Sequence, residues 1–207
     1  MIDFTLSQLL MRACAVLLVS TLQGWAMAMA AGALGDAGPR HDGRLTIDPL
    51  RHVDMLGGAV ALIFSIGWAR WMAIDPRELR HGRFDLPLVV GAGFAAIVLG
   101  VLGLRFVRPL LLPLLPDTAA ATAFALIQTI IELGLWFALF GLLPLPPLAG
   151  GHLLVAIAPK LRERLPGVQL FLGLILGGLV AMGVVTRVLD PAYRILFSLV
   201  MGEAAGI

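Results

Sequence analysis

Phe140-Gly-Leu-Leu-Pro-Leu-Pro-Pro-Leu-Ala-Gly-Gly-His152 separates two apolar regions of the chain. A long apolar run ends near Leu143, and three of the next four residues are prolines. Proline has no backbone N–H and breaks a helix. In a bilayer, such a break is tolerated only where protein or a water-filled cavity satisfies the freed backbone groups. We therefore predict buried, irregular backbone here, followed by a short apolar helix from His152 to Ala158. A break of this kind is typical of a site in a membrane protein.

The composition predicts an integral membrane protein. The chain has 207 residues, of which 59% are hydrophobic and 14% charged, and its mean hydropathy is +0.96. Soluble domains carry about 25% charged residues. We expect residues 1–207 to form a single integral membrane domain, an all-α polytopic helical bundle with about four spans plus re-entrant half-helices. The small net charge of +2 and the position of the arginines beside apolar runs exclude a nucleic-acid partner.

The apolar runs predict spans at residues 6–33, 86–104, 118–143 and 170–188, and a short helix over 192–201. We expect Arg105, Arg108 and Pro109 to end the second span, and extended pieces to flank a turn at Asp42-Gly43. Residues 55–74 are either a span or a re-entrant segment. A re-entrant segment places most loop arginines on one face, whereas a span divides them equally. The bias of basic residues toward the cytoplasm therefore favours the re-entrant segment, with residues 34–85 cytoplasmic and the N-terminus outside.

Residues 142–148 and Gly150 resemble a signature of the site-2 proteases, which are intramembrane zinc metalloproteases. That signature reads N-L-L-P-I-P-P-L-D-G-[GS]. Gly141 stands at its Asn position, and Ala149 stands at its Asp position, which is a zinc ligand in the family. Residues 43–54 are similar to the family's G-R-L-T-L-N-P-x-x-H-I-D segment, and residues 67–80 to its G-W-A-K-P-V-x-V-N-P-x-x-L-R segment. The resemblance covers about residues 21–200 and implies a helical core around a site within the bilayer.

The resemblance also implies a catalytically degenerate member. Aligning Leu34-Gly-Asp36 with the family's L-G-D places Gln23, Gly24 and Met27 at the three chemical positions of H-E-x-x-H. In that motif two His on one helix face bind zinc and the Glu acts as base. An amide is a poor zinc ligand, glycine has no side chain, and a thioether suits softer metals. We therefore expect no metal, no other cofactor and no catalytic residue.

Polar residues outside that motif have two interpretations. Glu132 is a costly acid in a predicted span, so it is either functional or a neutral, hydrogen-bonded residue that locks helices together. His152 either faces the former active-site cavity or caps the broken backbone, whereas His41 and His52 are loop residues expected to be solvated or hydrogen-bonded. We predict that the interface or cavity comprises Gln23, Gly24, Met27, Glu132, Gly141, Pro144, Pro146, Pro147, Ala149, Gly150, Gly151 and His152.

The sequence predicts a non-catalytic pseudoprotease that serves as a binding, assembly or scaffold subunit in the bacterial inner membrane. Its expected partners are membrane lipid and transmembrane helices of other proteins. A respiratory or photosynthetic complex is one candidate partner, although no residue in the sequence indicates it. The alternative is a zinc metalloprotease with relocated ligands drawn from His152, Glu132, His41 or His52. A transporter would suit broken helices but lacks the inverted repeat of that class.

Overall fold

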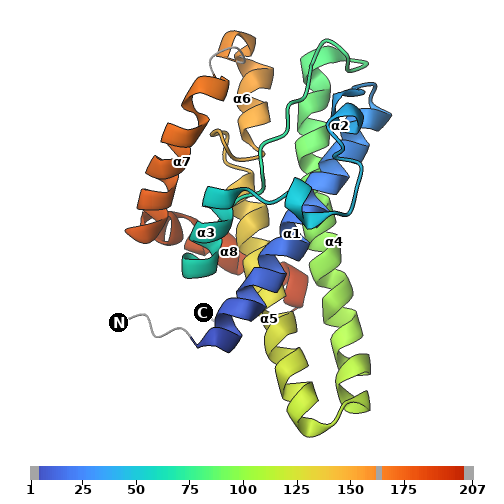
Figure 1. The fold of residues 1–207 in the computed structure, drawn as a ribbon, viewed down its shortest axis with the longest axis vertical. Helices are drawn as coiled ribbons and strands as arrows, with labels where there is room; N and C mark the ends of the chain where they lie inside the picture. The colour runs from blue at the N-terminus through green and yellow to red at the C-terminus, as the bar shows by residue number, and fades with distance from the viewer. Residues whose placement is uncertain (1–4, 162–164, 203–207) are drawn as a thin grey trace.

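The computed structural model describes residues 5–161 and 165–202 as a bundle of helices (Figure 1). Beyond the helices, the described residues show only an isolated bridge between Val53 and Ala69. This arrangement confirms the predicted all-α, polytopic fold class. The helices are α1 Leu6–Ala33, α2 Gly38–His41, α3 Met55–Phe64, α4 Leu86–Leu111, α5 Asp117–Gly141, α6 Gly151–Ile157, α7 Leu165–Ala181 and α8 Val184–Met201, with short 3-10 turns at η1 Pro49–Arg51, η2 Gly82–Asp85, η3 Leu112–Leu114 and η4 Pro159–Leu161.

Helices α1, α4 and α5 pack against one another and form the centre of the bundle. Each is long and apolar enough to span a membrane, and among the described residues the bent pair α7–α8 would add a fourth span. Figure 1 shows α4 and α5 as an antiparallel hairpin that α1 crosses at an angle. Gly134 lies where a Cβ would contact Val101, Ile97 and Val19, so its missing side chain allows the three helices to approach closely.

Helix α3 is too short to cross the membrane. It has ten residues, which corresponds to about 15 Å, whereas the hydrocarbon core is about 30 Å thick. It ends at Ser65, which adopts the left-handed conformation. The chain then returns past the start of α3, where Arg70 donates its backbone N–H to the carbonyl of His52 at 2.7 Å. This geometry agrees with the re-entrant interpretation of residues 55–74.

The helix of the second span extends beyond its predicted end, because α4 continues through Arg105, Arg108 and Pro109. The two arginines do not end the helix because each has a partner there. Arg105 donates to the carbonyl of Val200 at 2.6 Å, and the Arg108 guanidinium lies 4.9 Å from the centroid of the Phe124 ring. Pro109 falls in the last turn, where it removes only one helical hydrogen bond.

The last two helices also differ from the prediction. The predicted span 170–188 is interrupted, because α7 ends at Ala181 and α8 begins at Val184 with a bend of 75° between them. Gly183 has a φ of 70°, a left-handed conformation that stops a helix. The expected helix start at Asp190-Pro191 is wrong, since both residues lie inside α8, where Asp190 pairs with Arg194 at 2.8 Å.

The predicted extended pieces beside Asp42-Gly43 are also wrong. Instead, α2 precedes the turn, with Pro39 near its start. A proline is favourable in the first turn of a helix because its φ is already helical and its missing N–H has no helical partner there. Asp36 fixes this segment: its carboxylate accepts hydrogen bonds from the backbone N–H of Gly38 at 2.8 Å and of Asp75 at 2.9 Å.

Candidate functional site

The predicted break between apolar regions is present and joins α5 to α6. Helix α5 ends at Gly141, and the backbone N–H of Gly150 donates to the carbonyl of Gly141 at 2.6 Å, which closes the loop between them. A Cβ on Gly150 would lie 2.3 Å from the carbonyl oxygen of Leu143, so only glycine fits. Pro146 and Pro147 are buried, whereas Pro144 is exposed. Residues 146–148 of the irregular backbone are therefore enclosed by protein, as the membrane environment requires, whereas Pro144 and Leu145 are exposed, so the prediction of a wholly buried break is only partly correct.

This loop meets α1 around a very small void. About 20 Å³ of space is accessible to the centre of a water molecule there. That is room for about one water. The void is lined by Gln23, Gly24 and Met27 of α1, by residues 69–72, and by Pro147, Ala149 and His152. The structure thus brings together the four residues that the sequence analysis aligned with the family's chemical positions.

His52 occupies the space beside Gly24. A Cβ built on Gly24 would lie 2.3 Å from the His52 Nδ1. The imidazole is fully buried, its Nε2 lies 2.8 Å from the carbonyl oxygen of Thr46, and its Nδ1 has no hydrogen-bond partner. Burial lowers the pKa of His52 below its ordinary value, so the ring is neutral at pH 7. The sequence predicted that His52 is solvated or hydrogen-bonded, and the hydrogen bond is present. It did not predict that the His52 side chain lies beside Gly24 of α1.

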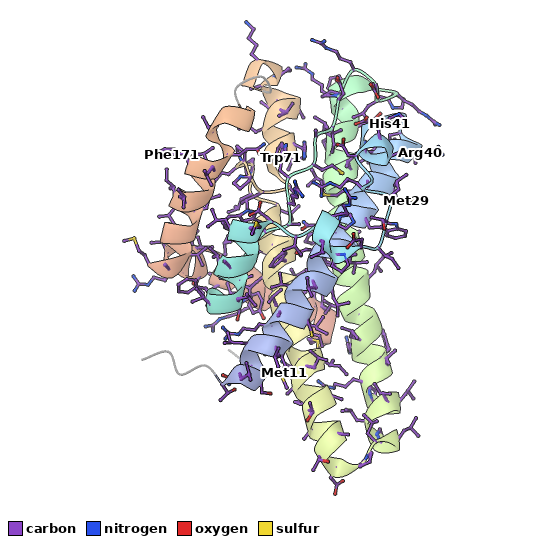
Figure 2. All side chains as sticks on the ribbon, in the orientation of Figure 1. Met11, Met29, Arg40, His41, Trp71 and Phe171 are labelled. Atoms are coloured by element: carbon purple, nitrogen blue, oxygen red, sulfur yellow. The ribbon has the colours of Figure 1, made fainter. Side chains whose placement is uncertain are left out.

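His152 stacks on Trp71 at the same void. The two ring centroids are 4.0 Å apart and the planes differ by 19°. The imidazole is buried, and its Nε2 has no hydrogen-bond partner. Figure 2 shows Trp71 within the outline of the bundle. This stacking was not predicted from the sequence, because Trp71 and His152 lie far apart along the chain and only the fold brings their rings together.

The other predicted site residues are divided between this centre and the rest of the molecule. A Cβ on Gly141 would lie 3.1 Å from the Gln23 amide nitrogen, and one on Gly151 would lie 2.8 Å from Trp71. Both glycines therefore belong to the centre. His41 is exposed on α2, at the edge of the bundle in Figure 2.

Glu132 lies outside the centre. It lines a separate polar cavity of about 150 Å³ together with Gln8, Arg12 and Ser65. Its carboxylate accepts a hydrogen bond from the Gln128 amide at 2.7 Å, one turn earlier in α5. This hydrogen bond lies within α5, so it does not test the expectation that Glu132 locks two helices together.

The three residues aligned with the family's zinc ligands do not fit zinc. Gln23, Met27 and Ala149 supply an amide, a thioether and a methyl group, whereas zinc sites are built from imidazole, thiolate and carboxylate. Within residues 5–161 and 165–202, no three side chains of the His, Cys, Asp and Glu classes are grouped so that they could hold a metal ion.

A comparison with curated proteins supports the resemblance seen in the sequence. The chain is 33% identical over 153 residues to a Bacillus subtilis (strain 168) protein named "Putative zinc metalloprotease YwhC"; the match covers 72% of this chain and 67% of that protein. The chain belongs to the site-2-protease-like family. No family model matches this site-2-protease-like chain, and no solved structure matches it.

A buried arginine of this site-2-protease-like chain was missed in the sequence. Arg44 is only 8% exposed, and its guanidinium donates to the backbone carbonyls of Arg51 and, at 3.0 Å, Trp71. It therefore connects the loop before α3 to the returning segment after it. The similarity of residues 43–54 to a family segment was the signal that could have drawn attention to it.

Proposed function

We propose that this protein is a non-catalytic, site-2-protease-like membrane protein that binds transmembrane helices of partner proteins as an assembly or scaffold subunit. The observation that carries the proposal is the chemistry of the centre. Hydrolysis by a bound metal needs ligands for the ion and a group that handles the proton of the attacking water. Gln23, Gly24, Met27 and Ala149 supply neither, and the void between them has room for about one water.

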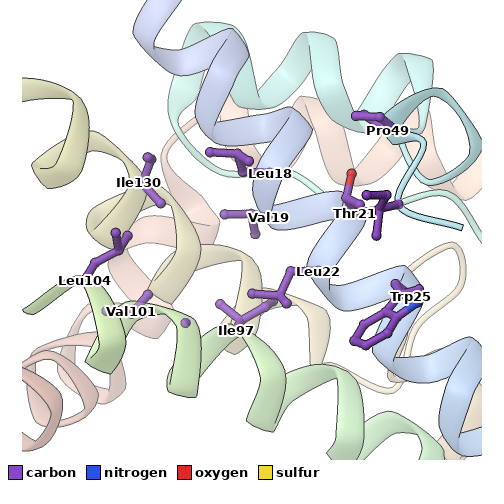
Figure 3. A pocket seen from close by; sticks show the side chains of 12 residues that line it. Leu18, Val19, Thr21, Leu22, Trp25, Pro49, Ile97, Val101, Leu104 and Ile130 are labelled. Carbon is purple, nitrogen blue, oxygen red and sulfur yellow. The ribbon is translucent and has the colours of Figure 1, made fainter. Parts of the chain in front are cut away.

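The size of the void also determines where a partner helix could bind. The sequence led us to expect binding in the cavity between Gln23 and Ala149, which is too small for a helix. A groove with about 490 Å³ of accessible space lies between α1, α4 and α5 (Figure 3). Its lining is almost wholly apolar and includes Leu18, Leu22 and Ile97, with the small residue Gly100 among them. Close packing drives helix association in lipid, so this groove is the helix-binding surface that we propose.

The alternative is a zinc metalloprotease whose ligands have moved. Two buried ring nitrogens without partners, His52 Nδ1 and His152 Nε2, favour it. Within the described part of the chain, they are not joined by the third His, Cys, Asp or Glu that a site would need. The scaffold interpretation therefore explains more of the structure.

Elemental analysis of the purified protein after washing with a chelator separates the two functions. We expect no stoichiometric zinc, because the centre lacks ligands. A matched positive control carries Gln23→His, Met27→His and Ala149→Asp together, which introduces the family's three zinc ligands at the aligned positions, and keeps Gly24. This variant should bind zinc. If the unaltered protein retained about one zinc per chain and lost it on His152→Ala, the metalloprotease interpretation would replace ours.

Binding is tested by isolating the protein from its native membrane and identifying the subunits that accompany it. Leu22→Trp adds bulk in the groove and should reduce recovery of the partner, whereas Glu132→Gln, in a different cavity, should leave it unchanged. Equal recovery with both variants would show that the groove is not the binding surface. A respiratory or photosynthetic complex is the partner we propose to look for first.

A further inference from the structure

A larger cavity lies beside the void at the centre. It has about 980 Å³ of accessible space and opens between the start of α3 and α7, which are neighbours in Figure 1. Ligand pockets in proteins measure about 300–1,000 Å³. Its wall includes Arg44, Arg70 and Trp68, and its size suits a small molecule or a lipid headgroup.

The inner wall of this cavity carries positive charge without a paired anion. The Arg44 guanidinium is buried and donates to backbone carbonyls only. The ion pairs found among the described residues involve Arg51, His81 and Arg194, and neither Arg44 nor Arg70 takes part in one. Burial and then the nearby charge of Arg70 lower the pKa of Arg44. A buried cation without a counter-ion is costly, so the site favours an anion.

Two carboxylates also line the cavity, and neither neutralises Arg44 by direct contact. Asp54 is the cap of α3, where its carboxylate accepts the backbone N–H of Gly57 at 2.7 Å. Asp42 is exposed and forms no ion pair with Arg44, although its charge favours the charged guanidinium. The lining therefore holds two arginines and two carboxylates, of which Arg70 is exposed and Arg44 is the buried cation without a carboxylate in direct contact.

A residue of the same wall, Trp68, has a buried hydrogen-bond donor without an acceptor. Trp68 is 2% exposed and lines the cavity, and its indole Nε1 has no partner. Buried donors are nearly always paired. An indole N–H and two guanidinium groups together suit phosphate, which offers more acceptor oxygens than a carboxylate and matches the planar fork of arginine.

The rim of the cavity is apolar. Leu50, Met55 and Leu170 line it and are 76%, 92% and 70% exposed. A free phosphate would gain nothing from these side chains, whereas an acyl chain would. We propose that this cavity binds the phosphate group of an anionic membrane lipid, whose acyl chains leave over Leu50, Met55 and Leu170. Basic pockets between membrane helices are known to hold anionic headgroups.

The test is a binding titration of the full chain in detergent, followed by tryptophan fluorescence, with dioctanoyl phosphatidylglycerol as the probe. Arg70→Gln should weaken binding about tenfold or more, because it removes a charged donor. Trp68→Phe, which keeps the ring and loses the N–H, should weaken it severalfold. Arg77→Gln is the matched control on an exposed loop outside the cavity, and its effect should stay below about twofold. Arg70 is preferred to Arg44 because the Arg44 side chain joins two backbone segments and its loss risks misfolding.

Two further probes test whether the cavity binds an anionic lipid, a free phosphate ion or any lipid that carries a phosphate group. Inorganic phosphate and zwitterionic dioctanoyl phosphatidylcholine should both bind at least about tenfold more weakly than phosphatidylglycerol. Equal binding of inorganic phosphate would make this a free-phosphate site, and equal binding of phosphatidylcholine would remove the requirement for an anion. If Arg70→Gln and Arg77→Gln weakened phosphatidylglycerol binding equally, binding would depend on the overall surface charge and not on this cavity. Any of these three results overturns the proposal, and none depends on the zinc or partner experiments.

Discussion

Gly24 is fixed by a residue from a distant part of the chain. Its Cα faces the buried imidazole of His52, whose own Nε2 lies against the Thr46 carbonyl oxygen. A side chain at position 24 would therefore have to displace a ring that is already fully enclosed. Packing thus leaves no room for a larger side chain at position 24, which the sequence analysis aligned with the family's catalytic base.

We expect Gly24→Ala to destabilise the protein by about 1–3 kcal/mol, the usual cost of overpacking a filled interior. Thermal unfolding in detergent would measure it. Gly32→Ala, on the same helix with nothing within 4 Å of the added Cβ, is the matched control and should be neutral or slightly stabilising. If the added methyl group is the cause, combining Gly24→Ala with His52→Ala should cost less than the sum of the two single changes.

At the scale of elements, the bend between α7 and α8 depends on one residue. Gly183 has a φ of 70° and lies at the break, and it has open space around it, so backbone conformation rather than crowding requires glycine there. The bend brings α8 against α5, where Tyr193 stacks on Trp136 with ring centroids 4.3 Å apart.

We therefore expect Gly183→Ala to lower the free energy of unfolding by about 1–2 kcal/mol, the cost of a left-handed conformation in a residue with a Cβ. Thermal unfolding is again the measurement. Gly178→Ala lies within α7, also with open space, and should be neutral or stabilising because alanine favours a helix. A loss at Gly178 as large as that at Gly183 would contradict the conformational explanation.

For the whole molecule, the prediction concerns which ends of the bundle face the cytoplasm. The turn between α4 and α5 lies at the opposite end of α4 from η2, since α4 is a single helix between them. The bias of basic residues places α2 and η2 on the cytoplasmic face. With Cys14→Ala as background, single cysteines from Ala37→Cys and Arg83→Cys should react with an impermeant thiol reagent from the cytoplasmic side. Leu114→Cys, which replaces a side chain that is 80% exposed, should react from the other side. Opposite labelling of Ala37→Cys and Arg83→Cys would show that the segment between them crosses the membrane.

The sequence by itself determined the membrane class, the central spans, the break at Pro144–Pro147 and the resemblance to the site-2-protease-like family. These follow from hydropathy, from the chemistry of proline and from short motifs, all of which act locally along the chain. Only the tertiary structure decided that His52 fills the space beside Gly24, that Glu132 lies in another cavity and that Arg44 is buried and lines the same cavity as Trp68. The physical reason is that each of these depends on contacts between segments far apart in sequence. Burial, unpaired donors and the space left for a ligand are properties of that packing and leave no periodic signal in the chain.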